Sequence, residues 1–187
     1  MERKAVNKWL KIFSISFLIL SIVSLVDLIL FSSIINVFID SQNLTILTII
    51  FQSGLMSFHA MLIWIILFVI FCGFIVFSYS IFKVANKNTI KDEILAKFLL
   101  LIGLFLIIGG FITMNFIVLL GKTTINSVPT PITFQHALYS PSITPIIGAI
   151  MWMYFSFLIY CFLISGMIFG GIGLKWMLLI QEKENSS

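Results

Sequence analysis

Charged side chains are scarce in this chain of 187 residues: Asp, Glu, Lys and Arg together make up 10%, whereas hydrophobic residues make up 60%. A soluble chain of this length cannot hide so much apolar surface, because its own surface must stay solvated. The composition therefore excludes an ordinary soluble domain and predicts a protein whose solvent is the lipid bilayer. The net charge of +4 is too small for the basic stripe of a nucleic-acid-binding surface, so we expect no nucleic-acid partner.

Cysteine and histidine are also rare, with two residues of each kind. Cys72 and Cys161 fall inside hydrophobic stretches, which excludes a disulfide framework and is typical of small apolar residues in helices. His59 and His136 lie in separate predicted loops, without the carboxylates or thiolates that complete a metal site. No phosphate-binding loop, zinc-protease helix or haem-attachment motif is present. The sequence therefore predicts neither an enzyme nor a bound cofactor or metal.

Long apolar runs are what the chain does contain. Each of four runs can cross a hydrocarbon core about 30 Å thick, which takes about 20 helical residues. Backbone groups surrounded by lipid must bond within their own segment, so each run must be helical. We predict an all-α integral membrane protein, one domain built as a bundle of four transmembrane helices. The predicted spans are 12–39, 60–82, 98–120 and 146–174, and the predicted outer loops are 40–59 and 121–145.

The basic residues are sorted along the chain, and only Lys122 of the eleven lies in an outer loop. Lys and Arg accumulate on the cytoplasmic side of membrane proteins, so we expect both termini and the middle loop to be cytoplasmic, in the cell membrane. Trp9 and Trp176 at the inner span ends, and Trp64 and Trp152 near the outer ends, are expected to form aromatic belts. The other ten basic residues are Arg3, Lys4, Lys8, Lys11, Lys83, Lys87, Lys91, Lys97, Lys175 and Lys183.

The two outer loops differ in composition. The apolar part of the first loop, 44–58, is interrupted by polar residues and is too short to span, so we expect an interfacial or re-entrant helix there. The second loop holds all four prolines, which predicts extended and irregular backbone rather than helix. Asn43 begins a glycosylation sequon with Thr45 and is a candidate glycosylation site. The interrupting residues are Gln52, Ser53 and Gly54, and the prolines are Pro129, Pro131, Pro141 and Pro145.

One acid, Asp27, lies inside a predicted span. A carboxylate at the centre of a helix costs about 2.5–3.5 kcal/mol on insertion, which the many apolar residues of this span outweigh. No Lys, Arg or His lies within any span to pair with it. At about 1.5 Å per helical residue, Asp27 lies at the depth of Thr113, Asn115 and Tyr160, which predicts an intramembrane polar layer. Three states are open: a protonated acid bonded within the helix packing, a carboxylate paired with an ion, substrate or partner subunit, or a side chain displaced to the interface.

Small residues fall at helix-packing spacings in three spans. Glycines three, four or seven residues apart lie on one helix face and let two backbones approach closely, within the bundle or with a partner. The serines of the first span lie largely on one face and favour the same interpretation. The glycines are Gly103, Gly110, Gly166, Gly170 and Gly173. The serines are Ser14, Ser21, Ser24 and Ser32. Apart from the pairing of spans, the two halves of the chain show no evident repeat.

These features favour a non-catalytic accessory or structural subunit of a larger membrane complex, engaged through the glycine faces and Asp27. Its expected partners are the lipid bilayer and other membrane subunits or further copies of itself. The alternative is an oligomeric protein that translocates an ion or small molecule, with Asp27 as the proton- or cation-coupled site. A redox subunit using His59 and His136 is a third reading. The chain lacks the outer-loop cysteines of claudin-like proteins and the compact loops of small multidrug exporters, so no family is identified.

Overall fold

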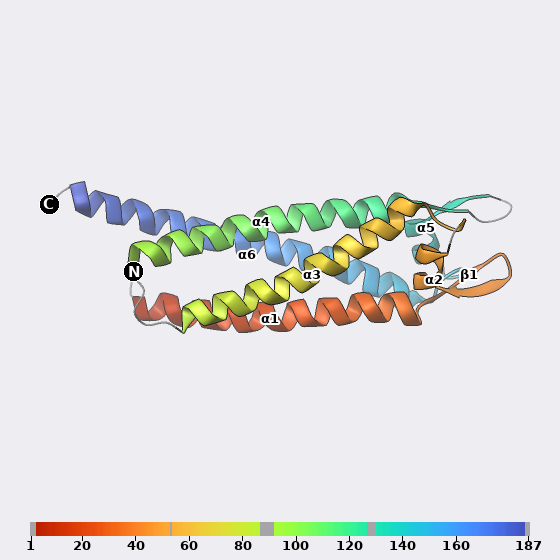
Figure 1. Cartoon of the computed structure of the whole chain (residues 1–187), viewed down its shortest axis with the longest axis horizontal. Helices are drawn as coiled ribbons and strands as arrows, with labels where there is room; N and C mark the ends of the chain where they lie inside the picture. The colour runs from red at the N-terminus through yellow and green to blue at the C-terminus, as the bar shows by residue number, and fades with distance from the viewer. Residues whose placement is uncertain (1–2, 53, 87–91, 127–129, 186–187) are drawn as a thin grey trace. The chain divides into compact units, whose positions relative to one another are not determined.

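The computed structural model describes residues 3–52, 54–86, 92–126 and 130–185 of the chain (Figure 1). Within these ranges the chain is mostly helical, and four helices are long and apolar enough to cross a membrane, which confirms the prediction of four helical spans. The four helices are α1 (Arg3–Ile34), α3 (Phe58–Ala85), α4 (Asp92–Lys122) and α6 (Ile146–Asn185). The described residues leave out Ser53, Lys87, Lys91 and Pro129, which the sequence predictions used, and the side chains of Arg3, Lys4 and Lys183.

Backbone contacts divide the chain into two compact units, and each long helix contributes a segment to both. The terminal unit contains both ends of the chain and comprises Met1–Leu20, Phe74–Ile112 and Ile159–Ser187. The hairpin unit comprises Ser21–Gly73 and Thr113–Leu158, and it contains all the strands and short helices of the described residues.

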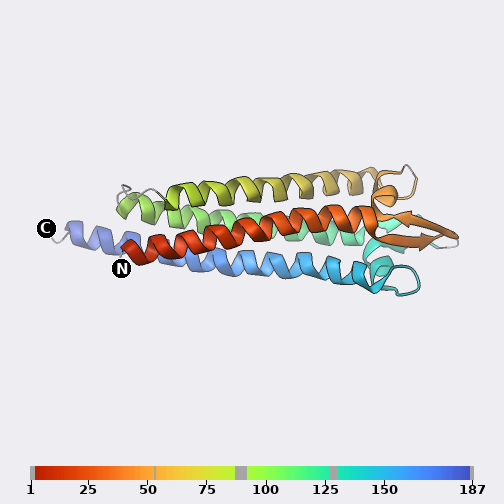
Figure 2. The same ribbon diagram turned by 90° about the horizontal axis from the view of Figure 1, so that it is seen from below.

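A β-hairpin follows α1 in the hairpin unit (Figure 2). Strands β1 (Asn36–Ile39) and β2 (Gln42–Thr45) pair antiparallel and lead into a six-residue helix, α2 (Ile46–Phe51). The predicted first span therefore ended too late, because α1 stops at Ile34. Residues 35–39 are β-branched or aromatic except for one Asn, and their side chains alternate between exposed and buried, as in a strand. Of the helix expected within residues 44–58, the structure has the six residues of α2, and its interfacial or re-entrant position stays a prediction.

The connection between α4 and α6 contains a second hairpin and a second short helix, which corrects the expectation of irregular backbone. Strands β3 (Thr124–Ile125) and β4 (Ile132–Thr133) pair antiparallel, and α5 (Phe134–Tyr139) follows directly. The side-chain oxygen of Thr133 accepts a hydrogen bond from the backbone N–H of His136 at 3.3 Å and caps the helix. The prolines do not prevent this helix, because they lie on either side of it.

The two halves of the chain share one spacing of elements. Asn36 begins β1, and Thr124, 88 residues later, begins β3. Thr45 ends β2, and Thr133, 88 residues later, ends β4. Phe58 begins α3, and Ile146, 88 residues later, begins α6. The chain therefore contains the same succession twice, without a gap: long helix, hairpin, six-residue helix, long helix. This internal repeat was not evident from the sequence.

Contacts between the halves are reciprocal under the same shift of 88 residues. In the hairpin unit, the Phe38 N–H donates to the Ile143 carbonyl at 2.8 Å, and the Asn126 N–H donates to the Leu55 carbonyl at 2.8 Å. Asn126 corresponds to Phe38, and Ile143 corresponds to Leu55. Residue i of one half meets j of the other and j meets i, which is the contact pattern of a two-fold dimer.

The aromatic core of the terminal unit has the same reciprocity. Phe74 and Phe162, which correspond to each other, meet edge to face with ring centroids 4.8 Å apart. Phe17 meets Phe162 at 5.1 Å, and its counterpart Phe105 meets Phe74 at 6.2 Å. These rings come from all four long helices, and edge-to-face pairs at such distances are favourable. The terminal unit is therefore held together where the two repeats meet.

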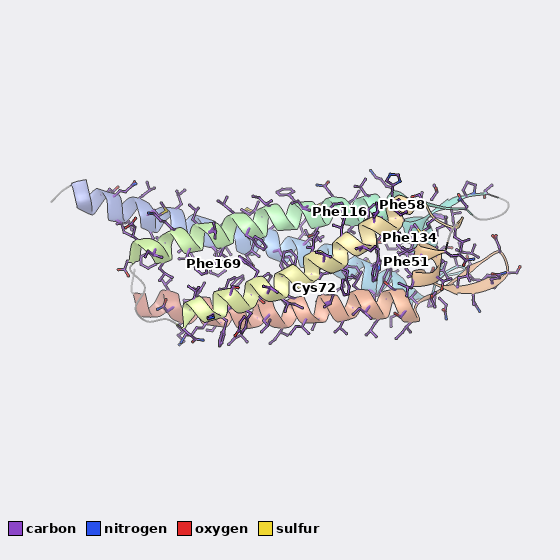
Figure 3. All side chains as sticks on the ribbon, in the orientation of Figure 1. Phe51, Phe58, Cys72, Phe116, Phe134 and Phe169 are labelled. Carbon is purple, nitrogen blue, oxygen red and sulfur yellow. The ribbon has the colours of Figure 1, made fainter. Side chains whose placement is uncertain are left out.

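Large hydrophobic side chains also project outward along all four long helices (Figure 3). Ile19 of α1 is 57% exposed, Val69 of α3 61%, Leu101 of α4 59% and Met167 of α6 61%. Water does not solvate apolar surface of this extent, whereas lipid chains do. The surface is therefore compatible with a multi-pass membrane protein.

Candidate functional site around Asp27

Asp27 lies in the hairpin unit, seven residues before the end of α1, or about 10 Å along the helix axis. It lies at the boundary between the buried face and the exposed face of the helix. Ser24 and Leu28 are buried, whereas Val23 and Leu30, one turn before and one turn after Asp27, are 46% and 42% exposed. The carboxyl group therefore stands beside an apolar strip that faces outward.

The carboxyl group of Asp27 is chemically incomplete within this chain. Its Oδ2 atom is buried and has no hydrogen-bond partner among the described residues. Leaving a buried polar atom unpaired costs about 1–3 kcal/mol, and more when the group is charged. Such an oxygen can accept a hydrogen bond or bind a cation, or it can donate if protonated. No described residue supplies the atom that would pair with this oxygen.

The other members of the predicted polar layer are distributed unevenly. Thr113 is fully buried and lies in the hairpin unit with Asp27. Asn115 belongs to the same unit but is exposed. Tyr160 belongs to the terminal unit and is 54% exposed. A layer that joins all four side chains therefore stays a prediction.

Asp27 and Asn115 occupy corresponding positions in the repeat. Asn115 lies 88 residues after Asp27, and each is seven residues before the last residue of its helix, Ile34 or Lys122. Their shared depth is a consequence of this correspondence. Asn has the shape of Asp without the acid, so only one of the two equivalent positions carries an ionisable group. The repeated fold therefore offers two equivalent positions, but the acidic site is present at only one of them.

Four serines of α1 are fully buried, namely Ser14, Ser21, Ser24 and Ser32. The hydroxyls of Ser14 and Ser32 are satisfied within the chain. The Ser14 Oγ donates to the Lys11 carbonyl at 2.8 Å, and the Ser32 Oγ donates to the Leu28 carbonyl at 2.7 Å. Ser32 also accepts a hydrogen bond from Trp64 Nε1 at 2.8 Å. Serines that bond back to the helix backbone pack as small residues and need no ligand.

The predicted packing glycines bring α4 and α6 together in the terminal unit. A Cβ atom at Gly103 would lie 2.5 Å from the Gly170 Cα and 2.7 Å from the Gly166 carbonyl oxygen. One at Gly173 would lie 2.5 Å from the Leu100 backbone nitrogen. Real Cβ atoms do not approach backbone so closely, so only glycine allows these contacts. Gly110 is less tightly enclosed, with a Leu163 methyl group 3.1 Å from the Cβ position.

The remaining candidate residues lie at the surface. Asn43 is exposed on β2, and the Thr45 oxygen of its sequon accepts a hydrogen bond from the Thr48 N–H at 3.2 Å, which caps α2. His59 and His136 are exposed. In the part of the chain that the structure describes, no three His, Cys, Asp or Glu side chains are grouped to hold a metal ion.

Two tryptophans expected at the membrane surface make packing contacts in the hairpin unit, where Trp152 is buried and Trp64 is half-buried. Trp152 is only 5% exposed; its ring stacks on Phe31 at 5.9 Å and meets Phe134 at 5.5 Å. Trp64 corresponds to Trp152 in the repeat, bonds to Ser32 and meets Phe51 at 5.5 Å. The sequence signal for this packing role is that Trp64 and Trp152 lie equally far from the hairpin that precedes each of them.

Comparison with protein-family models, curated proteins and solved structures finds no match for this chain.

Proposed function

We propose that this protein is a non-catalytic accessory subunit of a larger membrane complex and that Asp27 is its principal contact with a neighbouring subunit. One observation carries the proposal: the Oδ2 atom of Asp27 is buried and lacks a hydrogen-bond partner among the described residues. Asp27 stands beside the exposed strip of α1 that includes Val23 and Leu30. A helix packed on that strip lies next to Asp27, and a rotation of the Asp27 side chain brings the buried Oδ2 atom to the partner.

The partner helix supplies a hydrogen-bond donor or a cation at the depth of Asp27. In hydrocarbon an unpaired acid is costly, so a partner that satisfies it is favoured over one that does not. The apolar residues around the acid then pack by shape against the partner, as in other membrane helix pairs. Because Asn115 replaces the acid in the second repeat, one partner helix binds each chain.

The glycine faces contribute less to this contact than the sequence suggested. Gly103, Gly166 and Gly173 lie against backbone or side-chain atoms of the same chain, so their surfaces are already covered. The partner therefore engages α1 rather than the glycines of α4 and α6.

The orientation is also part of the proposal: four helices in one bundle in the cell membrane, with both chain ends and the 83–97 connection in the cytoplasm. Its support is the distribution of Lys and Arg. Ser41→Cys, in the β1–β2 turn, is expected to react with a membrane-impermeant maleimide applied to intact cells. Asn86→Cys is expected to react only after the cells are opened. The reverse pattern would overturn the orientation.

Affinity purification of the tagged full chain in mild detergent tests the subunit assignment. We expect a specific partner in near-stoichiometric amount, identified by mass spectrometry. Asp27→Asn, which keeps the shape of the side chain, is expected to lower the partner yield about tenfold, equivalent to about 1.4 kcal/mol. Asn115→Ala is the matched control and is expected to leave the yield unchanged. A single species containing only this chain would contradict the proposal.

Translocation is the second candidate, and the internal repeat is the observation that favours it. Many transporters are built from two repeats related by an axis along the membrane normal, with an ionisable group at membrane depth. This reading predicts that the purified chain in liposomes passes protons or cations and that Asp27→Asn abolishes the flux without unfolding the protein. Equal flux in both proteins would exclude Asp27 as the coupling site.

A further inference from the structure

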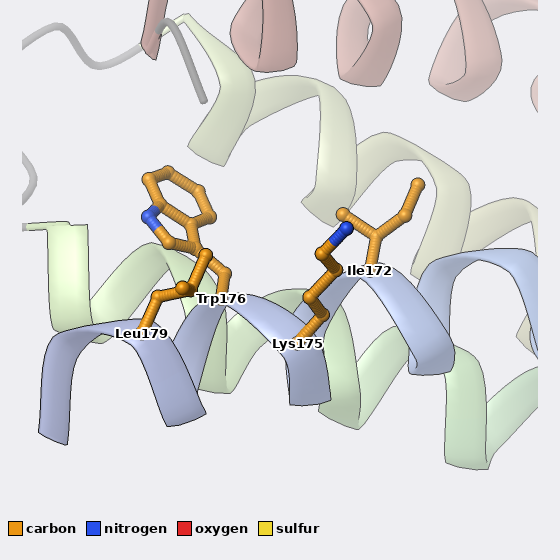
Figure 4. A pocket seen from close by; sticks show the side chains of 4 residues that line it. All are labelled: Ile172, Lys175, Trp176 and Leu179. Carbon is orange, nitrogen blue, oxygen red and sulfur yellow. The ribbon is translucent and has the colours of Figure 1, made fainter. Parts of the chain in front are cut away.

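A groove lies along one side of α6 near the C-terminal end of the helix, in the terminal unit (Figure 4). Its volume is about 340 Å³, and its lining residues are Ile172, Lys175, Trp176 and Leu179. These positions follow the spacing i, i+3, i+4 and i+7, so they share one face of the helix. Figure 4 shows Trp176 beside Leu179 and Lys175 beside Ile172. Among the described residues, the groove therefore has mainly apolar walls and one cation.

The lysine of this groove has no polar partner among the described residues. Lys175 is exposed and makes no hydrogen bond or ion pair with any residue that the structure describes. Lys97, by contrast, pairs with Glu93 one turn away on α4. Trp176 is only 7% exposed, so its ring forms a fixed wall rather than a mobile flap. The ammonium group of Lys175 is thus free for an anion next to an ordered apolar surface.

A contact between α1 and α6 gives the level of the groove along the helices. Phe169, six residues before Lys175, packs on Phe13 of α1 with ring centroids 4.2 Å apart. Lys8 lies five residues before Phe13, and α1 and α6 run in opposite directions, so Lys8 and Lys175 share a level (Figure 1). Lysine and tryptophan at the end of an apolar span are typical of the lipid headgroup region.

We propose that this groove binds one anionic phospholipid. The phosphate group meets the Lys175 ammonium, and an acyl chain lies along Ile172, Leu179 and the Trp176 ring. Neither part alone defines the ligand. A free anion does not pack against the apolar walls, and a lipid without net charge is attracted less strongly to the Lys175 ammonium group. The inference requires only that the helices span a bilayer and is independent of the proposed role of Asp27.

Quenching of tryptophan fluorescence tests the site in the full chain. The protein is placed in phosphatidylcholine bilayers that contain a minor fraction of one brominated lipid, either phosphatidylglycerol or phosphatidylcholine. Brominated phosphatidylglycerol is expected to quench more strongly at equal mole fraction. A lysine near the membrane surface contributes about 1 kcal/mol to such binding, which corresponds to about a fivefold preference for the anionic lipid. Bromine quenches at short range, so the signal reports lipid beside the ring.

Three variants locate the signal. Trp176→Phe is expected to remove the difference between the two brominated lipids, because Trp176 is the tryptophan among the described residues that line the groove. Lys175→Gln is expected to make quenching by the two lipids equal. Lys83→Gln is the matched control, since Lys83 is exposed in the same unit but does not line the groove, and it is expected to keep the difference. Circular dichroism checks that each variant is folded.

Three kinds of result would overturn the proposal. Equal quenching of the unaltered protein by both lipids would show that the groove has no preference for an anionic headgroup. A preference that survives Lys175→Gln or Trp176→Phe would place the lipid elsewhere. A preference that disappears equally in Lys83→Gln would mean that the overall positive charge, rather than this groove, attracts the lipid.

Discussion

Replacing Gly173 by alanine tests the packing of α4 against α6. The added Cβ would lie 2.5 Å from the Leu100 backbone nitrogen and 2.9 Å from the Ala96 carbonyl oxygen. Ordinary contacts begin near 3.4 Å, so the two helices must separate by about 1 Å. The obstacle is backbone, which cannot rotate away as a side chain does. The contact between the helices is therefore expected to loosen along its length.

The magnitude follows from two opposing effects. Overpacking a fitted contact costs about 1–3 kcal/mol. Alanine in place of glycine also favours the helix by up to about 1 kcal/mol. Gly171→Ala is the matched control, because it lies in the same helix and its Cβ meets nothing within 4 Å. The helix term is common to both variants, so the difference between their stabilities isolates the packing cost of about 1–3 kcal/mol.

Reversible unfolding in mixed micelles of increasing SDS content, followed by circular dichroism, measures both variants. Gly173→Ala is expected to unfold at a lower SDS fraction than Gly171→Ala. Gly103→Ala with Gly73→Ala as its control repeats the test from the α4 side, because Gly73 also has open space at its Cβ. If each member of a pair unfolds at the same SDS fraction as its control, α4 and α6 do not approach as described.

Three further predictions use the same unfolding measurement. Asp27→Leu is expected to stabilise the isolated chain by up to about 1–3 kcal/mol, because it removes an unpaired buried oxygen; a loss of stability would show that the acid serves the chain's own packing. Ser32→Ala is expected to cost about 0.5–1.5 kcal/mol through the lost bond from Trp64, whereas Ser80→Ala, at an exposed site, is nearly neutral; equal effects would refute that bond's contribution. Ser41 has a φ of 63°, so Ser41→Gly is expected to stabilise the hairpin by about 1 kcal/mol, and a destabilisation would exclude the left-handed turn.

The four long helices were predictable because apolar runs of more than 20 residues have few alternatives in a bilayer. The end of α1 was not, since Ile35, Val37 and Ile39 are as hydrophobic as the helix before them. The turn at Asp40 and Ser41, with φ values of 50° and 63°, comes only after β1, so it does not mark where α1 ends. Hydropathy measures the preference for lipid and does not distinguish helix from strand over so few residues.

The repeat escaped detection for a related reason. In a lipid-facing helix one apolar residue can replace another, so corresponding positions stay apolar but carry different amino acids. Thr45 and Thr133, Trp64 and Trp152, and Phe74 and Phe162 are among the few identical pairs.

The candidate site was predictable in part. Asp27 stood out because an acid in a long apolar run is costly wherever it lies. Sequence depth also grouped Asp27 with Asn115, which the repeat now explains. Depth gives no information on which side of a helix faces outward. The exposure of Asn115 and Tyr160 therefore became visible only when the helices were packed.

Photo-crosslinking from α1 in native membranes tests the role of Asp27 most directly. A photoreactive amino acid replaces Val23, which is exposed one turn before Asp27. Phe111, exposed one turn before Asn115, is the matched position in the second repeat. The account predicts a single protein adduct from position 23 that disappears in an Asp27→Asn background, and no such adduct from position 111. Adducts to lipid alone, or a protein adduct unaffected by Asp27→Asn, would contradict it.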